Sequence, residues 1–149
     1  MSKGQSTATE LTSDRDFLPD VLRVEGNALL QLASGIESDD TQADAWAKAV
    51  ALIDACPGHV VVSGMGKSGL VGAKISATLA SVGVPSHVVH PADAVHGDLG
   101  RIRTNDVVLL LCFSGGTQEV VSLAAILRTD GVKRIGISKS HDSALAGLC

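Results

Sequence analysis

The chain has 149 residues, a hydrophobic fraction of 45% and a formal net charge of −4 at pH 7. This length fits one domain with a core of its own, and so high an apolar content argues against an intrinsically disordered chain. The negative charge and the scarcity of aromatic residues (two Phe, one Trp and no Tyr) argue against a nucleic-acid partner, which requires a basic face and stacking rings.

The sequence shows no signal that would direct the chain to or through a membrane. No apolar run approaches the length of a membrane span, and residues 1–16 are polar and lack the apolar centre of a signal peptide. The three cysteines, Cys56, Cys112 and Cys149, are odd in number and lack metal-ligand spacing. We therefore expect reduced thiols in a cytoplasmic protein with no membrane partner.

The first part of the chain predicts a tail followed by two helices. Residues 1–15 are rich in Ser, Thr and Gly and predict a flexible tail, and residues 16–149 are expected to form a single domain. Helical spacing of apolar residues predicts an amphipathic helix over 17–36. Its apolar stripe consists of Leu18, Leu22, Leu29, Leu32 and Ile36. Residues 38–41 supply capping side chains for a second helix, which ends at Pro57-Gly58.

Beyond these helices, strands and helices alternate. Nearly unbroken Val, Ile and Leu runs predict strands, and periodic segments predict helices at 68–82 and 118–129. The expected strands are 59–63, 85–90, 106–112 and 133–138. This alternation predicts an α/β fold with a parallel sheet covered by helices on both faces, a three-layer α/β/α sandwich. Residues 140–143 look like the start of a helix that is too short to complete a unit, so we expect either a fragment of a longer protein or an unusual last element.

A glycine-rich loop, Gly64-Met65-Gly66-Lys67-Ser68-Gly69, follows the first strand. Its G-x-G-x-x-G pattern suggests a dinucleotide site, but the next strand ends at His90 without the required acidic residue. A P-loop would need glycine where Val61 stands. What remains is an anion-binding turn at a helix N-terminus, with Lys67 as its cation. The alternative is a tight turn that only needs glycine for its backbone path.

A second loop, Ser114-Gly115-Gly116-Thr117, follows the third predicted strand and leads into a helix that carries Glu119 in its first turn. Two glycines between hydroxyls could wrap a phosphate, although Glu119 could simply complement the helix dipole. The connection over residues 90–100 holds His90 and His96 with two Asp. Capping aspartates in an ordinary loop would explain this, and a metal site lacks recognised spacing, so we predict no metal. A histidine that passes protons near a sugar hydroxyl is the functional alternative.

Three motifs in order give the chain a specific resemblance. Residues 60–149 resemble the sugar isomerase (SIS) domain, and more narrowly the arabinose-5-phosphate isomerases, which interconvert ribulose 5-phosphate and arabinose 5-phosphate for bacterial lipopolysaccharide or capsule sugars. The matching segments are Gly64 to Gly69, His90 to Gly100, and Ser114-Gly115 with Thr117 and Glu119. The chain departs from the family at Phe113, where Asn is usual, and at Gly116, where Glu or Asp is usual.

The resemblance implies a fold, an activity and a set of site residues. It implies a parallel sheet of flavodoxin-like strand order, with the domain's C-terminal strand and closing helices missing from this chain. It also implies an aldose–ketose isomerisation of a sugar phosphate through an enediol, without a cofactor. The catalytic residues would be Lys67, Glu119 and His96. Substrate and phosphate would be held by Ser63, Gly64, Gly66, Ser68, Ser114, Gly115 and Thr117. The expected assembly is a homodimer or homotetramer formed through the N-terminal helices. The alternative is a non-catalytic or regulatory module that only binds a sugar phosphate.

Overall fold

The structure is a computed structural model that describes residues 14–149, with side chains from Phe17 onward. Residues 1–13, most of the predicted tail, lie outside the described residues. The chain divides into two compact units at the boundary between Trp46 and Ala47, and each is described by itself. No helix among the described residues is both long enough and apolar enough to cross a membrane.

The first unit contains the two predicted helices up to residue 46. Helix α1 spans Asp14–Ser38, and helix α2 spans Asp40–Asp54, so that its last turns belong to the second unit. The carboxylate of Asp39 accepts a hydrogen bond from the backbone N–H of Thr41 at 2.9 Å, which caps α2 as the sequence predicts. No described residue of α1 is buried.

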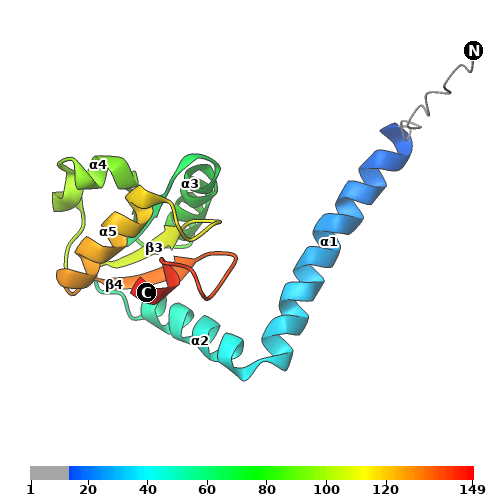
Figure 1. Ribbon diagram of the computed structural model, residues 1–149, viewed down its shortest axis with the longest axis horizontal. Helices are drawn as coiled ribbons and strands as arrows, with labels where there is room; N and C mark the ends of the chain where they lie inside the picture. Colours follow the sequence, from blue (N-terminus) through cyan, green and yellow to red (C-terminus); the bar gives the residue numbers. More distant parts are fainter. Residues whose placement is uncertain (1–13) are drawn as a thin grey trace, which may run out of the picture. The chain divides into compact units, whose positions relative to one another are not determined.

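The second unit is built on four parallel strands, shown in Figure 1. They are β1 (Val60–Gly64), β2 (Ser86–Val88), β3 (Val107–Leu111) and β4 (Lys133–Ile137), in the order β2-β1-β3-β4. In the central register, Val61 pairs with His87 on one side and with Val108 on the other. This order confirms the parallel sheet predicted from the sequence and the flavodoxin-like order implied by the resemblance.

Helices cover both faces of this sheet, which confirms the three-layer sandwich (Figure 1). Helix α3 (Gly66–Ser81) and the end of α2 pack on one face, where Ile75 and Ile53 join the core. The short helix α4 (Pro91–Val95) and helix α5 (Gln118–Thr129) pack on the other, where Leu123 and Leu127 are buried. Alternate residues of each strand point to opposite faces, so each face has its own apolar cluster.

The connection between β2 and β3 differs from the plain loop that the sequence suggests. Pro91 begins α4, because a proline at the first helical position loses no internal hydrogen bond. A 3₁₀ turn, η1 (Asp98–Arg101), follows, and Ala94 packs into the core. At the chain's end, the predicted helix start leads only to a 3₁₀ turn, η2 (Ala146–Leu148).

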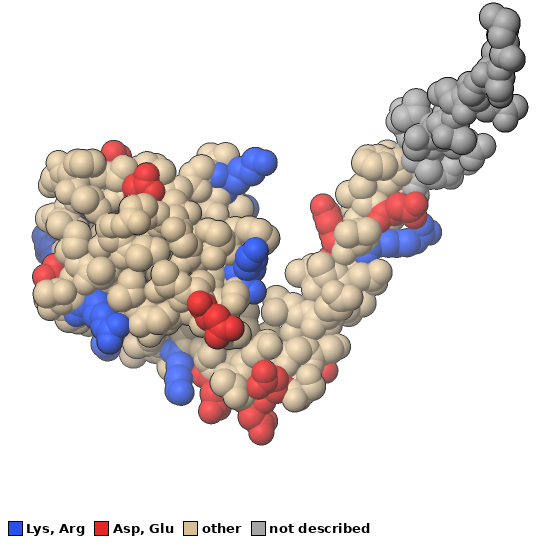
Figure 2. All heavy atoms as spheres, viewed as in Figure 1, with Lys and Arg blue, Asp and Glu red and all other residues tan. Residues whose placement is uncertain are grey.

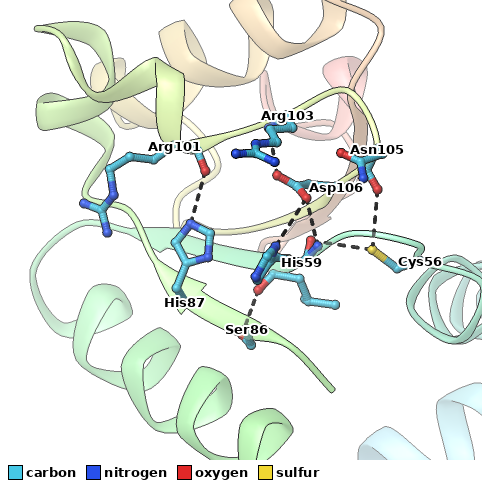
Figure 3. A network of polar contacts seen from close by, with 9 residues as sticks. Cys56, His59, Ser86, His87, Arg101, Arg103, Asn105 and Asp106 are labelled. Atoms are coloured by element: carbon cyan, nitrogen blue, oxygen red, sulfur yellow. Dashed lines mark hydrogen bonds and ion pairs between the residues drawn. The ribbon is translucent and has the colours of Figure 1, made fainter. Parts of the chain in front are cut away.

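A polar network fixes the amino ends of the strands (Figure 3). The buried carboxylate of Asp106 accepts hydrogen bonds from the backbone N–H groups of His59 at 2.8 Å and of Arg103 at 2.7 Å. Nearby, a ring nitrogen of His87 lies 3.2 Å from the carbonyl oxygen of Arg101. These contacts tie β1, β2 and the entry to β3 together at one edge of the sheet, so that the opposite, carboxyl edge is free to carry the loops.

Candidate functional site

The strand order places a topological switch point, called the crevice below, at the carboxyl edge of the two central strands, β1 and β3. The chain leaves β1 into α3, which covers one face, and leaves β3 into α5, which covers the other. Connections that depart to opposite faces from neighbouring strands leave a gap between them, and open α/β sheets bind ligands at such a switch point. The two loops singled out from the sequence, at residues 64–69 and 114–117, flank this gap.

The first loop brings the backbone at the start of α3 to the crevice. Gly66 has a φ of +53°, which favours glycine, and a side chain there would meet nothing within 4 Å. Gly69 lies against β1 so closely that a Cβ would stand 2.6 Å from the carbonyl oxygen of Gly64. No side chain caps the N-terminus of α3, in contrast to α2, so its first N–H groups are available to a ligand.

The second loop is organised around Cys112, the residue after β3. The thiol lies 3.2 Å from Oγ1 of Thr117 and 3.7 Å from Oγ of Ser114. The Ser114 hydroxyl also accepts a hydrogen bond from the backbone N–H of Gly116 at 3.2 Å, and Gly115 takes a φ of +67°. Thr117 precedes α5 without a side-chain cap, so this helix N-terminus is also open.

Ser63 supplies a buried hydroxyl near the carboxyl end of β1. It is fully buried, and its Oγ has no hydrogen-bond partner among the described residues. In register it stands opposite Leu110, on the face that α5 covers, one step along that face from Cys112. Because a buried hydroxyl is costly to leave unpaired, this atom indicates a place for a polar ligand.

The predicted catalytic residues differ in how the structure places them. Glu119 is half-buried in the first turn of α5, one turn before the buried Leu123 and therefore on the sheet side of the helix. Lys67 is exposed at the start of α3, with no hydrogen bond or ion pair to any described residue, while Ser68 is half-buried beside it. His96 is exposed at the end of α4, and no hydrogen bond joins it to either loop among the described residues.

Two features of the site were not singled out from the sequence. The first is Cys112, which the sequence analysis treated only as a reduced thiol. The second is the segment after β4: the N–H of Lys139 donates to the carbonyl of Phe113 at 3.0 Å, and that of Leu145 to the carbonyl of Gly115 at 2.9 Å. The Lys139 ammonium also lies 5.4 Å from the centre of the exposed Phe113 ring. The segment therefore braces the second loop from the side of β4.

The Cys112 thiol is acidified by its surroundings. Burial raises its pKa, but hydrogen bonds from the Thr117 and Ser114 side chains and from the backbone of Thr117 and Gly115 together outweigh burial, so the pKa lies below the ordinary value. By contrast, burial raises the pKa of the Cys149 thiol, and the charge of Arg134 opposes that rise. All three cysteines are free thiols.

Charge and metal-ligand groups are sparse around the site. Within residues 14–149, no group of three or more His, Cys, Asp or Glu side chains is arranged to hold a metal ion. On the face drawn in Figure 2, positive and negative side chains are interspersed, and neither sign forms a continuous field. The two loops and the helices after them thus offer backbone N–H groups, hydroxyls, the Lys67 cation and the Glu119 carboxylate, which suits a small phosphorylated ligand.

Comparison with known proteins identifies the family of this chain. Residues 54–149 match the SIS domain family, and the chain belongs to that family.

Particular relatives narrow the resemblance. The chain is 43% identical over 136 residues to the arabinose 5-phosphate isomerase KpsF of Escherichia coli, a match that covers 91% of this chain and 40% of the relative. It is 52% identical over 103 residues to the arabinose 5-phosphate isomerase KdsD of Pseudomonas aeruginosa, covering 69% and 32%. A solved structure of an E. coli CFT073 protein in complex with arabinose 5-phosphate is 36% identical, with a TM-score of 0.76, and the match covers 93% of this chain and 72% of that one. The chain thus spans well under half the length of these two curated relatives.

Proposed function

We propose that this chain binds a sugar phosphate at the crevice between β1 and β3 and interconverts ribulose 5-phosphate and arabinose 5-phosphate. The observation that carries the proposal is the fully buried Ser63 hydroxyl near the carboxyl end of β1, which has no hydrogen-bond partner among the described residues, together with the two helix N-termini after β1 and β3 that no side chain caps. A phosphate would satisfy these groups and gain from both helix dipoles. The relatives named above support the choice of pentose phosphate.

The reaction assigned to this site moves a proton between neighbouring carbons. Glu119, on the sheet side of α5, would remove the proton next to the carbonyl and return it to the adjacent carbon of the enediol. Lys67 would stabilise the negative oxygen of that intermediate, and His96 would assist ring opening or proton relay. Ser63, Ser68, Ser114 and Thr117, with the N–H groups of both loops, would fix the phosphate and so hold the reacting carbons in place.

The test is binding together with proton exchange. We expect calorimetry to show binding of arabinose 5-phosphate by the 149-residue chain, and NMR in heavy water to show exchange of the proton at C2 of the sugar. Binding without exchange would favour a non-catalytic, regulatory module, and absence of binding would overturn the proposal.

Lys67→Ala is expected to weaken arabinose 5-phosphate binding about tenfold, because a charge-assisted hydrogen bond contributes about 1.5–3 kcal/mol and part of the anion cradle remains. The same calorimetric titration measures this effect. Lys74→Ala is the matched control, since Lys74 is an exposed lysine further along the same helix. Equal affinities for the two variants would show that Lys67 does not contact the ligand.

We also infer that the protein works as a homodimer or homotetramer joined through α1. The predicted stripe is exposed in this structure, with Leu22 at 67% and Leu29 at 70% exposure. Its members recur at intervals of three, four and seven residues, which suits pairing with a second helix of the same kind. Such a stripe on a free helix would be a large apolar surface in water.

Light scattering tests the assembly. The wild-type chain is expected to give at least a dimer mass, and Leu29→Asp a monomer, because a charge in the stripe opposes helix pairing. Gln31→Asp places the same charge on the opposite side of α1 and should leave the mass unchanged. A monomeric wild type at working concentration would contradict the inference.

The cellular compartment and the use of the product can be inferred from the thiols and from the charge of the substrate. We infer a cytoplasmic protein that supplies arabinose 5-phosphate for lipopolysaccharide biosynthesis. Free thiols at all three cysteines agree with a reducing compartment, and doubly charged sugar phosphates are retained where they are made.

A further inference from the structure

Cys112 makes a backbone hydrogen bond that connects the second loop to β4, and side-chain contacts within that loop. Its backbone N–H donates to the carbonyl of Ile137 at 3.0 Å, and its own carbonyl accepts from the N–H of Gly115 at 2.9 Å. Its thiol contacts the hydroxyls of Thr117 at 3.2 Å and Ser114 at 3.7 Å. The side chain is 4% exposed, so these two hydroxyls are its polar surroundings within the loop.

An independent observation points to a ligand near this thiol. The Ser63 hydroxyl, which has no hydrogen-bond partner among the described residues, lies on the neighbouring strand, on the same sheet face, one step back from Cys112. A ligand oxygen at the end of these two strands would supply the missing partner.

We propose that Cys112 is a positioning residue of the sugar-phosphate site, which holds the Thr117 hydroxyl in the orientation that donates to the phosphate. The inference rests on the proposed function. A protonated thiol donates to Oγ1 of Thr117, which leaves the threonine hydroxyl hydrogen free to point at the ligand. An ionised thiolate instead accepts that hydrogen and places a negative charge beside the phosphate.

The ionisation of Cys112 should therefore oppose binding. Because the loop lowers the pKa of this thiol, it ionises at a pH below the ordinary one, and ligand affinity falls as the pH rises through that pKa. The surrounding elements carry further charged or polar titratable side chains, among them Lys67 on α3, His90 before α4, Asp93 on α4, Glu119 on α5, and Lys139, His141 and Asp142 after β4. None of these makes a hydrogen bond to Cys112. The cysteine must therefore be varied to isolate its part in the pH dependence.

The experiment measures calorimetric affinity for arabinose 5-phosphate from about pH 6.5 to 9.5 in the full chain. We expect Cys112→Ser to bind within about twofold of wild type at the lower pH, since its hydroxyl can make the same contacts, and to lose much of the weakening at high pH. Cys112→Ala is expected to bind about tenfold more weakly throughout. Cys149→Ser, which changes a thiol outside the second loop, should behave as wild type.

A second readout leaves Cys112 in place. With Cys56→Ser and Cys149→Ser combined, the remaining thiol can be titrated by its ultraviolet absorbance, and saturating arabinose 5-phosphate should raise its pKa. The proposal is overturned if Cys112→Ala binds as tightly as wild type, if Cys112→Ser keeps the full weakening at high pH, or if the ligand leaves the thiol's pKa unchanged. A wild-type chain that binds no sugar phosphate at any pH would refute the proposed function instead.

Discussion

Replacing Glu119 by glutamine is expected to slow proton exchange at C2 of arabinose 5-phosphate by about 10²–10⁴-fold, the usual contribution of a general base. Glutamine has nearly the same shape but cannot accept the proton. Glu119 makes no hydrogen bond or ion pair within the described part of the chain, so its replacement leaves no buried partner unpaired. Affinity for the sugar phosphate should change by no more than a few-fold. The measurement is deuterium incorporation in heavy water at saturating ligand.

The first turn of α5 offers a second explanation for this carboxylate, namely that it complements the positive end of the helix dipole. In that case Glu119→Gln would lower stability by about 0.3–1 kcal/mol and leave exchange untouched. Asp130→Asn is the control, because Asp130 lies at the other end of the same helix, away from the crevice. Exchange at the wild-type rate in Glu119→Gln would remove this residue from the mechanism.

The α/β core could be predicted from the sequence because its elements follow local patterns. The buried apolar runs predicted β1 and β3 to within two residues, and the bounds of α5 are those predicted. Strand β2 is shorter than predicted, since it is an edge strand with a partner on one side only. Helix α4 was missed because five residues are too few to show helical periodicity.

The candidate site could be predicted only in the parts where neighbouring residues of one loop supply the ligand-binding groups. Glycines and hydroxyls after a strand indicate an anion-binding loop whatever else packs around them, so the sequence was enough to single out both loops as candidates. The role of Cys112 depends on a turn that brings Thr117 back to the sulfur, which no spacing rule describes. The bracing of the second loop depends on residues some 30 positions later, and long-range contacts of this kind leave no local pattern.

Gly115→Ala is expected to lose much stability, because Gly115 packs closely against Ser143 in the segment after β4. A Cβ at Gly115 would lie 2.2 Å from the Cβ of Ser143, and the φ of +67° already disfavours any side chain. Ser143 cannot simply retreat, because its hydroxyl bonds to Ser138 at 3.0 Å and Leu145 is buried in the core. Backbone strain of about 1–2 kcal/mol and overpacking of about 1–3 kcal/mol together give an expected loss of about 2–5 kcal/mol.

Urea unfolding of Gly115→Ala beside Gly116→Ala measures this loss with a neighbouring control. A Cβ at Gly116 meets nothing within 4 Å, and its φ is not positive, so that variant should unfold close to wild type. Equal midpoints for the two variants would show that the segment after β4 does not pack on the second loop. A larger loss for Gly115→Ala would show that the second loop is held in place by the segment after β4, through the contact of Gly115 with Ser143.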